Sequence, residues 1–299
     1  MRSELLQLIT KAIVFQYDLP NSEKGIQKTI FSTDNDKCYL SENMNDIVSI
    51  IYNSIVEYSF NEFDITENEY KNLHAIALQT KLKYNKSQPE EVKIKHGFFG
   101  EVLLYAILYV FFKSKPLISR GYFYNPLEAA ETKGYDSYHL IENNNEVELW
   151  FGEVKFHKDH KSGIKSALEN IEKAISDNYL ERNILALTNH KNDFNFKKSK
   201  IETIINEWEK NPSISIMNEV KKHNMKLIYP VMIIYESNGN DYDSDIRKLP
   251  EYIAKKYTSK KFGLSIKHSI FFVLLPLKNV IKIKKEVIEW IESKKPLMS

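Results

Sequence analysis

Apolar side chains recur along this chain at two spacings, one helical and one strand-like, and their alternation predicts an α/β fold. Residues 102–111 are apolar almost without interruption, and the length of this run favours a buried helix. Residues 227–234 and 270–275 are apolar at consecutive positions, as in strands of a sheet that helices cover on both sides. Pro230 lacks the N–H that a central strand needs and predicts an edge strand or a bulge.

The first 95 residues predict a separate α+β segment. Residues 1–17 and 29–40 fit either a helix or a strand, and one interpretation places them in a small sheet. A helix begins near Ser41, where isoleucines recur on one face. A second helix runs from a capping box at 66–69 to about residue 84.

Residues 85–90 are polar, contain Pro89, and read as a linker. The sequence therefore predicts two parts, residues 1–95 and residues 96–299. The first part carries no recognisable chemistry and is a candidate for docking a partner.

From residue 96 the predicted elements are a helix at 102–111, strands at 116–124, 134–141 and 147–156, and a helix at 161–180. Asn143, Asn144 and Asn145 are a turn signal, so the strands on either side of them should pair as an antiparallel hairpin. Further elements follow, namely strands at 184–187, 227–235 and 270–275 and helices at 198–208, 245–257 and 280–292. This order is that of a layered α/β domain.

Composition narrows the class of protein. A hydrophobic share of 42% supports a real core, and a net charge of +2 excludes a uniformly basic nucleic-acid coat while allowing a local basic cleft. The single cysteine, Cys38, excludes a disulfide scaffold and a cysteine zinc site. No signal peptide is recognisable, and the longest apolar runs are shorter than the roughly 20 residues of a membrane span. These features predict a soluble cytoplasmic protein that has no membrane association.

The candidate chemistry lies between residues 134 and 156. Asp136 begins one predicted strand, and Glu153 and Lys155 lie near the end of the next. Residues two apart in a strand share a face, so Glu153 and Lys155 point the same way and Val154 points the other way. Two carboxylates close together favour a divalent cation, and hard oxygen ligands favour magnesium, with manganese as the alternative.

In this hypothesis Asp136 and Glu153 hold the cation, with the backbone carbonyl of Val154 as a further ligand. Lys155 would orient or deprotonate a water molecule, or neutralise charge in the transition state. Glu101, at the start of the buried helix, is a less certain third carboxylate.

Each residue also has a purely structural interpretation. Glu-x-Lys occurs six times in the chain, and only the copy at Glu153 lies in a strongly apolar strand. Glu153 and Lys155 can form an ion pair at a strand end, and Asp136 can cap a turn. Glu101 can simply interact favourably with the helix dipole.

Several lysines are candidates for contacts with a phosphate backbone, which position a nucleic acid without reading its sequence. Lys158, Lys161 and Lys165 follow the motif directly. Solvated helix charges are the equal alternative for them. The same two interpretations apply to four further lysines near the end of the chain, and an exposed helix face is favoured for them, namely Lys278, Lys282, Lys284 and Lys285.

Helix residue Glu101, Gly134-Tyr135-Asp136 and Gly152-Glu153-Val154-Lys155-Phe156 together resemble the PD-(D/E)xK nuclease superfamily. The local amino-acid sequence around these residues is similar to that of HamA, the nuclease subunit family of Hachiman anti-phage systems. The resemblance covers about residues 96–180 by motif and the whole chain by length. Tyr135 stands where the superfamily pattern often has proline.

The resemblance implies a restriction-endonuclease-like α/β core, made of a helix, a three-stranded antiparallel meander, a helix and a further strand, with N-terminal and C-terminal elaborations. It implies a Mg²⁺-dependent DNA endonuclease that works with a helicase subunit (HamB-like) and needs no small-molecule cofactor. Asp136, Glu153, Lys155 and Glu101 would be its catalytic residues. A non-catalytic DNA-binding or scaffolding module that keeps the nuclease fold is the alternative.

Overall fold

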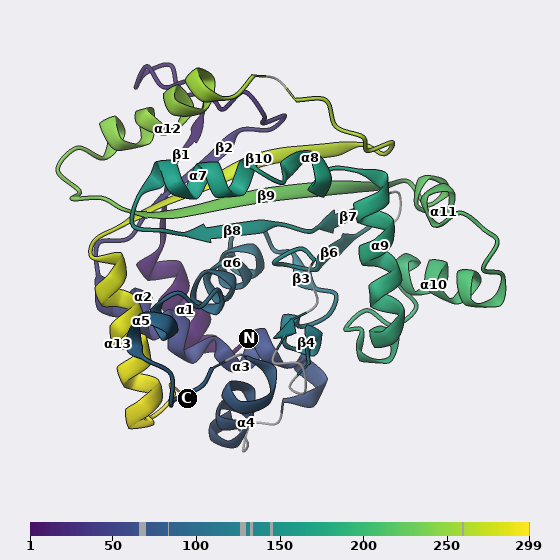
Figure 1. Cartoon of the computed structure of the whole chain (residues 1–299), viewed down its shortest axis with the longest axis horizontal. Helices are drawn as coiled ribbons and strands as arrows, with labels where there is room; N and C mark the ends of the chain where they lie inside the picture. Colours follow the sequence, from purple (N-terminus) through teal and green to yellow (C-terminus); the bar gives the residue numbers. More distant parts are fainter. Residues whose placement is uncertain are drawn as a thin grey trace.

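The structure, a computed structural model, describes residues 1–65, 70–82, 84–125, 130–131, 134–143, 146–258 and 260–298. Within these residues, eight strands form one mixed sheet in the order β1-β2-β10-β9-β7-β6-β3, and β8 pairs with β9 beside this path (Figure 1). The strands of the sheet are β1 (Val14–Leu19), β2 (Asp36–Leu40), β3 (Lys115–Pro116), β6 (His139–Glu142), β7 (Val147–Trp150), β8 (Glu153–Phe156), β9 (Met225–Glu236) and β10 (His268–Leu277). A small separate ladder joins β4 (Tyr124–Asn125) to β5 (Ala130–Glu131).

Helices cover both faces of the sheet (Figure 1). The α-helices are α1 (Ser3–Ala12), α2 (Met44–Asn53), α3 (Ile55–Ser59), α4 (Tyr70–Ile76), α5 (Glu90–Ile94), α6 (Phe98–Val110), α7 (His160–Leu168), α8 (Ile171–Ala174), α9 (Asp177–Leu187), α10 (Lys200–Lys210), α11 (Ile216–Lys222), α12 (Tyr242–Lys256) and α13 (Val280–Ser293). Side chains of α7, α9 and α12 form one hydrophobic core with one face of the sheet. Side chains of α1, α2, α6 and α13 form a second core with the other face.

Strand β9 lies between these two cores. Tyr229, Val231 and Ile233 belong to one core, while Met232 and Ile234 belong to the other. Such a strand is apolar at consecutive positions because neither face meets water. The predicted α/β fold with a helix-covered sheet is confirmed.

Pro230 lies in a central strand, so the expectation of an edge strand is wrong. On one side Pro230 pairs with Phe271 of β10. On the other side β9 pairs with β7 up to Ile228 and with β8 from Val231 onward. The missing N–H of Pro230 therefore falls where β9 changes partner, and no ladder hydrogen bond is lost there.

The predicted strand 147–156 is two strands for the same reason. Phe151 and Gly152 separate β7 from β8. A Cβ added at Gly152 would lie 2.8 Å from both Cγ and the carbonyl oxygen of Pro230, so only glycine fits against the proline here.

The first part of the chain contributes to the same sheet. Strand β1 pairs antiparallel with β2, and β2 pairs parallel with β10. Residues 3–12 form a helix, which corrects the strand interpretation, because Leu5, Ile9 and Ala12 bury one helical face. The division at residue 95 stays a prediction.

Three other predicted elements differ in detail. Residues 116–124 are not one strand but contain the 3₁₀-helix η3 (Arg120–Phe123), and residues 184–187 belong to α9. The helix predicted over 161–180 is broken into α7, α8 and the start of α9. The capping box at 66–69 lies outside the described residues, so that prediction stays open. Asn144 and Asn145 also lie outside them, but the antiparallel pairing predicted for the strands on either side of this turn is confirmed, because β6 pairs antiparallel with β7.

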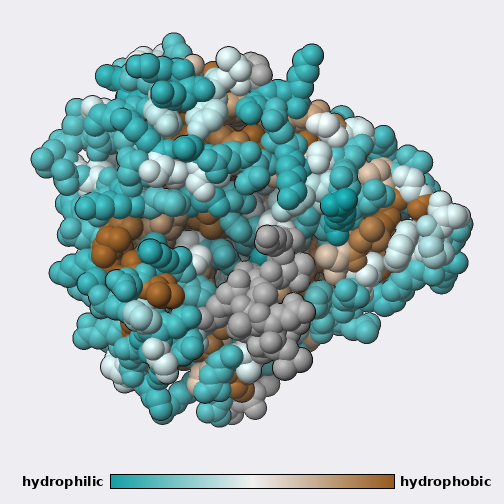
Figure 2. Space-filling model, viewed as in Figure 1, coloured by the Kyte–Doolittle hydropathy of each residue, from teal (hydrophilic) through white to brown (hydrophobic). Residues whose placement is uncertain are grey.

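The surface view in Figure 2 shows mainly hydrophilic side chains over the covering helices, with small hydrophobic patches between them. In the described part of the chain, no helix combines the length and the apolar character that crossing a bilayer requires.

Candidate active site

The outer edge of β8 is where the predicted site residues meet. Among the described strands β8 pairs only with β9, so its other edge carries no strand. Asp136 lies at this edge, and its Oδ2 accepts a hydrogen bond from the Val154 N–H at 2.9 Å. The Asp136 N–H in turn donates to the Gly152 carbonyl at 2.9 Å. Asp136 thus precedes β6 and lies in a loop, which corrects its placement in a strand.

The Val154 carbonyl points toward the same edge. In a parallel pair, alternate residues direct both their N–H and their C=O toward one neighbour. The His157 N–H bonds to Ile234 of β9, and the Val154 N–H bonds to Asp136 on the opposite side. The carbonyl oxygen of Val154 and the carboxylate of Asp136 therefore share the free edge of β8.

Glu153 and Lys155 point to the face that α7 covers, as the strand period predicts. A Cβ on Gly163 of α7 would lie 3.8 Å from the Lys155 Cβ. Val154 points the other way, where its Cγ2 would lie 3.2 Å from a Cβ on Gly100 of α6. Lys155 Nζ donates to Glu153 Oε1, and the two side chains are 21% and 22% exposed.

The pKa values of Asp136 and Glu153 are unusually high for carboxyls. Burial, and then the charge of Glu101, raise the pKa of Asp136 to about 7. Burial, and then the charge of Asp136, raise the pKa of Glu153 to about 7. Burial works against the charged form of Lys155, but the carboxylates of Glu153 and Asp136 outweigh it and raise the pKa of Lys155. Two desolvated carboxylates that lie close together repel each other, and an added positive charge stabilises their ionised forms.

Glu101 lies in the first turn of α6 and turns back over its start. A Cβ on Gly97 would lie 2.8 Å from Glu101 Oε1, and the Tyr58 hydroxyl donates to Glu101 Oε2. Glu101 is close enough to contribute to the pKa of both Asp136 and Lys155. Both of its predicted roles, at the helix dipole and beside the site, therefore agree with its position.

Arg120 is a site residue that the sequence interpretation missed. It lies in η3, is 6% exposed, and its guanidinium carbon is 5.1 Å from the Phe123 ring centre and 5.8 Å from that of Tyr138. Its charge lowers the pKa of both Asp136 and Glu153, against the larger effect of burial. A single arginine in the apolar segment 116–124 was the available signal, but the strand assignment concealed it.

Neighbouring side chains hold the edge in place. The Gly152 N–H donates to Ser137 Oγ at 2.9 Å, beside the Asp136 backbone. Tyr135 is buried and its hydroxyl donates to the Ala174 carbonyl at 2.7 Å. Tyr135, at the position where proline is often found, therefore anchors the Asp136 loop to α8 through its side chain.

The predicted phosphate-binding lysines are exposed. Lys158 follows β8, while Lys161 and Lys165 lie on α7. Their exposure fits both the nucleic-acid role and plain solvation. Lys284 corrects the expectation of an exposed face, because it is 7% exposed and donates to the Phe156 carbonyl at 3.0 Å.

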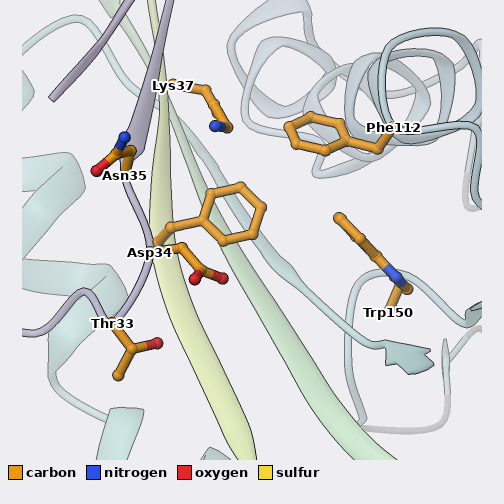
Figure 3. A pocket seen from close by; sticks show the side chains of 7 residues that line it. Thr33, Asp34, Asn35, Lys37, Phe112 and Trp150 are labelled. Carbon is orange, nitrogen blue, oxygen red and sulfur yellow. The ribbon is translucent and has the colours of Figure 1, made fainter. Parts of the chain in front are cut away.

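Two other features lie apart from these residues. A cavity of about 430 Å³ is lined by Thr33, Asp34, Asn35, Lys37, Phe112, Trp150 and Phe271, none of them a predicted site residue (Figure 3). Among the described residues, the three metal-ligand side chains with ligand atoms within 4.8 Å of one another are Glu207, Glu219 and His223. The carboxylate oxygens of Glu101, Asp136 and Glu153 do not all lie within 4.8 Å of one another.

The fold and the site define an α/β protein with two partly buried carboxyls and a lysine beside one strand edge. The HamA family model matches residues 8–291, so the chain belongs to the HamA family, as the local sequence around the motif indicated. This membership suggests a Hachiman-type role in anti-phage defence. No curated protein and no solved structure matches the chain significantly.

Proposed function

We propose that this protein is a metal-dependent DNA endonuclease, the effector of a bacterial anti-phage complex that also contains a helicase subunit. One observation carries the proposal. The Asp136 carboxylate and the Val154 carbonyl share the free edge of β8, directly beside Glu153 and Lys155. Membership in the HamA family supports the defence context.

The residues suit a hard divalent cation. Asp136, Glu153 and the Val154 carbonyl offer only oxygen ligands, which favours Mg²⁺ or Mn²⁺. The raised pKa of both carboxyls, caused first by burial, indicates a site that lacks positive charge. When bound, Mg²⁺ would lower the pKa of a water molecule and stabilise charge on the phosphate.

Lys155 is better suited to neutralising charge than to accepting a proton. Glu153 and Asp136 raise its pKa, so its ammonium group stays protonated at neutral pH. A protonated lysine next to the scissile phosphate stabilises the developing negative charge. Glu101 would support the site through its field at Asp136, and Arg120 would partly offset the repulsion between the carboxyls.

The contact with DNA would use the exposed basic side chains that follow β8. Lys158, Lys161 and Lys165 lie on one short stretch of chain next to the motif. Contacts from lysine to phosphate give affinity without sequence preference. The helicase subunit would then select the DNA that is cleaved.

Glu153→Gln and Lys155→Ala test the proposal. Each should reduce plasmid cleavage in Mg²⁺ by roughly 100-fold or more, which is the cost of losing one group that stabilises transition-state charge. Glu91→Gln is the matched control and should keep full activity, because Glu91 is the exposed glutamate of another Glu-x-Lys copy, on α5.

The alternative function is a DNA-binding module without catalysis. In that case the wild-type protein, with its helicase partner, would leave plasmid intact in Mg²⁺ as it does in a chelator. Full cleavage by both variants, with unchanged circular dichroism, would instead show that the site lies elsewhere.

A further inference from the structure

Helices α10 and α11 bring three potential metal ligands together, away from the strand edge described above. Glu207 lies on α10 and Glu219 on α11, and His223 directly follows α11. The His223 N–H donates to the Glu219 carbonyl at 3.0 Å, so the helical repeat continues through His223. Residues four apart in a helix share a face, and both side chains therefore point toward α10.

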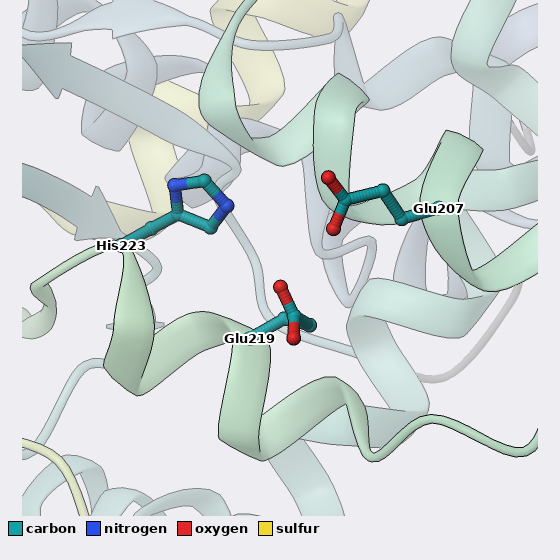
Figure 4. A group of neighbouring side chains, drawn as sticks. All are labelled: Glu207, Glu219 and His223. Atoms are coloured by element: carbon teal, nitrogen blue, oxygen red, sulfur yellow. The ribbon is translucent and has the colours of Figure 1, made fainter.

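The ligand atoms of these residues lie within 4.8 Å of one another. Figure 4 shows the two carboxylates and one ring nitrogen of His223 directed into a common space. Nε2 of His223 is shielded from solvent and has no hydrogen-bond partner among the described residues. A nitrogen that is buried, unpartnered and next to two carboxylates is placed to bind a cation.

Neighbouring charged side chains do not neutralise the carboxylates of Glu207 and Glu219. Lys222 donates to Glu219 at 2.8 Å, but its side chain is 63% exposed, and such surface pairs contribute little.

We propose that Glu207, Glu219 and His223 form a binding site for a divalent transition-metal ion such as Zn²⁺. The imidazole ligand favours this class of ion over Mg²⁺ and Ca²⁺, which prefer oxygen alone. Zinc bonds of about 2.0–2.1 Å need only modest rotations of these partly exposed side chains. Three protein ligands leave a fourth position for water.

The bound ion would connect α10 to α11 across residues 211–215. Helix α11 packs on β9 and α9, whereas α10 contacts α9, α11 and η4 (Thr188–Asp193). A metal link between the helices would therefore stabilise this end of the molecule. It involves no residue of the proposed nuclease site.

Calorimetric titration of the metal-free full-length chain with ZnCl₂ tests the proposal. His223→Ala and Glu207→Gln should each bind one equivalent of Zn²⁺ less than the wild-type chain. Glu209→Gln, two residues further along α10 and paired with Lys191, should bind as many as the wild type. Zn²⁺ at about 100 times its Kd should raise the Tm of the wild type by roughly 5 °C, and leave that of His223→Ala unchanged at this site.

Equal zinc stoichiometry in the wild type and His223→Ala would overturn the proposal. Circular dichroism establishes that the variants are folded, and Glu207→Gln decides the question if His223→Ala is not. Cleavage of DNA in Mg²⁺ should be the same in His223→Ala as in the wild type, which separates this site from the proposed nuclease site.

Discussion

Asp136 and Glu153 carry the most distinctive property of single residues in this chain. Both are carboxyls with a pKa of about 7, raised first by burial and then by a neighbouring carboxylate. Their surroundings offer partial compensation from Lys155 and Arg120. Groups with such shifts cluster at functional sites, where burial and neighbouring charges adjust pKa values to the chemistry.

The raised pKa of Asp136 predicts a pH dependence of stability. Its folded value of about 7 lies above its ordinary value of 3.8, so its contribution to stability is complete at low pH and is lost as pH rises toward and through 7. In a chelator at pH 8, Asp136→Asn should therefore be more stable than the wild type by roughly 1–3 kcal/mol. Thermal melting at pH 5 and pH 8 measures this difference.

At pH 5 that difference should shrink by more than half, because the folded wild-type carboxyl is then protonated while the unfolded one is still mostly ionised. Mg²⁺ added at pH 8 should raise the Tm of the wild type and leave that of Asp136→Asn nearly unchanged. A stability difference that is the same at both pH values would contradict the electrostatic explanation.

At the scale of elements, the site depends on the break between β7 and β8. Strand β9 pairs first with β7 and then with β8, and Pro230 lies between the two ladders. Gly152 fits against this proline and also accepts a hydrogen bond from Asp136. The break therefore separates β8 from β6 and leaves the edge on which Asp136 and the Val154 carbonyl meet.

Gly152→Ala should disturb both fold and site. Its Cβ would lie 2.8 Å from Pro230, and relieving that clash should lower the free energy of unfolding by about 1–3 kcal/mol. Cleavage should fall as well, because Glu153 is the next residue. Gly263→Ala is the control, since its Cβ would have its nearest neighbour at 3.8 Å. Equal urea midpoints for the two variants would speak against this account.

At the scale of the whole molecule, the two parts predicted from the sequence share one sheet and both of its hydrophobic cores. Strand β2 pairs with β10, and Asp36 accepts a hydrogen bond from the Phe272 N–H at 2.9 Å. Helices α1 and α2 pack in the same core as α6 and α13. The first 95 residues thus cover apolar surface that the rest of the chain would otherwise expose.

Residues 96–299 expressed alone should therefore fail to form a stable fold. The fragment would expose the edge of β10 and the core face of α6, which favours aggregation. Size-exclusion chromatography and circular dichroism of the fragment measure this. A monomeric fragment with a cooperative thermal transition would show instead that residue 95 is a true domain boundary.

The basic residues near the site predict a salt-dependent contact with DNA. Lys161→Ala should weaken DNA binding and reduce the slope of log K against log salt by about 1, as expected for the loss of one phosphate contact. Lys11→Ala, an exposed lysine on α1, should leave the slope unchanged. Fluorescence anisotropy at several salt concentrations distinguishes the two, and equal slopes would remove Lys161 from the interface.

Much of this arrangement follows from local sequence. The continuous apolar runs of β9 and β10 determined strands buried on both faces, and the strand period placed Glu153 and Lys155 together, opposite Val154. The helical spacing of Leu5, Ile9 and Ala12 was also present in the sequence. It lay beside the strand-like residues of β1, so periodicity alone did not separate the two elements.

The sequence by itself determined the α/β class, the buried helix α6 and the residue types of the site. Tertiary structure alone decided that Pro230 is central, that Arg120 and Lys284 are buried, and that Asp136 lies in a loop against the Val154 N–H. Local sequence encodes which face of an element is apolar, because that depends on residues two apart in a strand and three or four apart in a helix. It does not encode which distant edge the element meets, and the free edge of β8 exists only once β9 has paired with both β7 and β8.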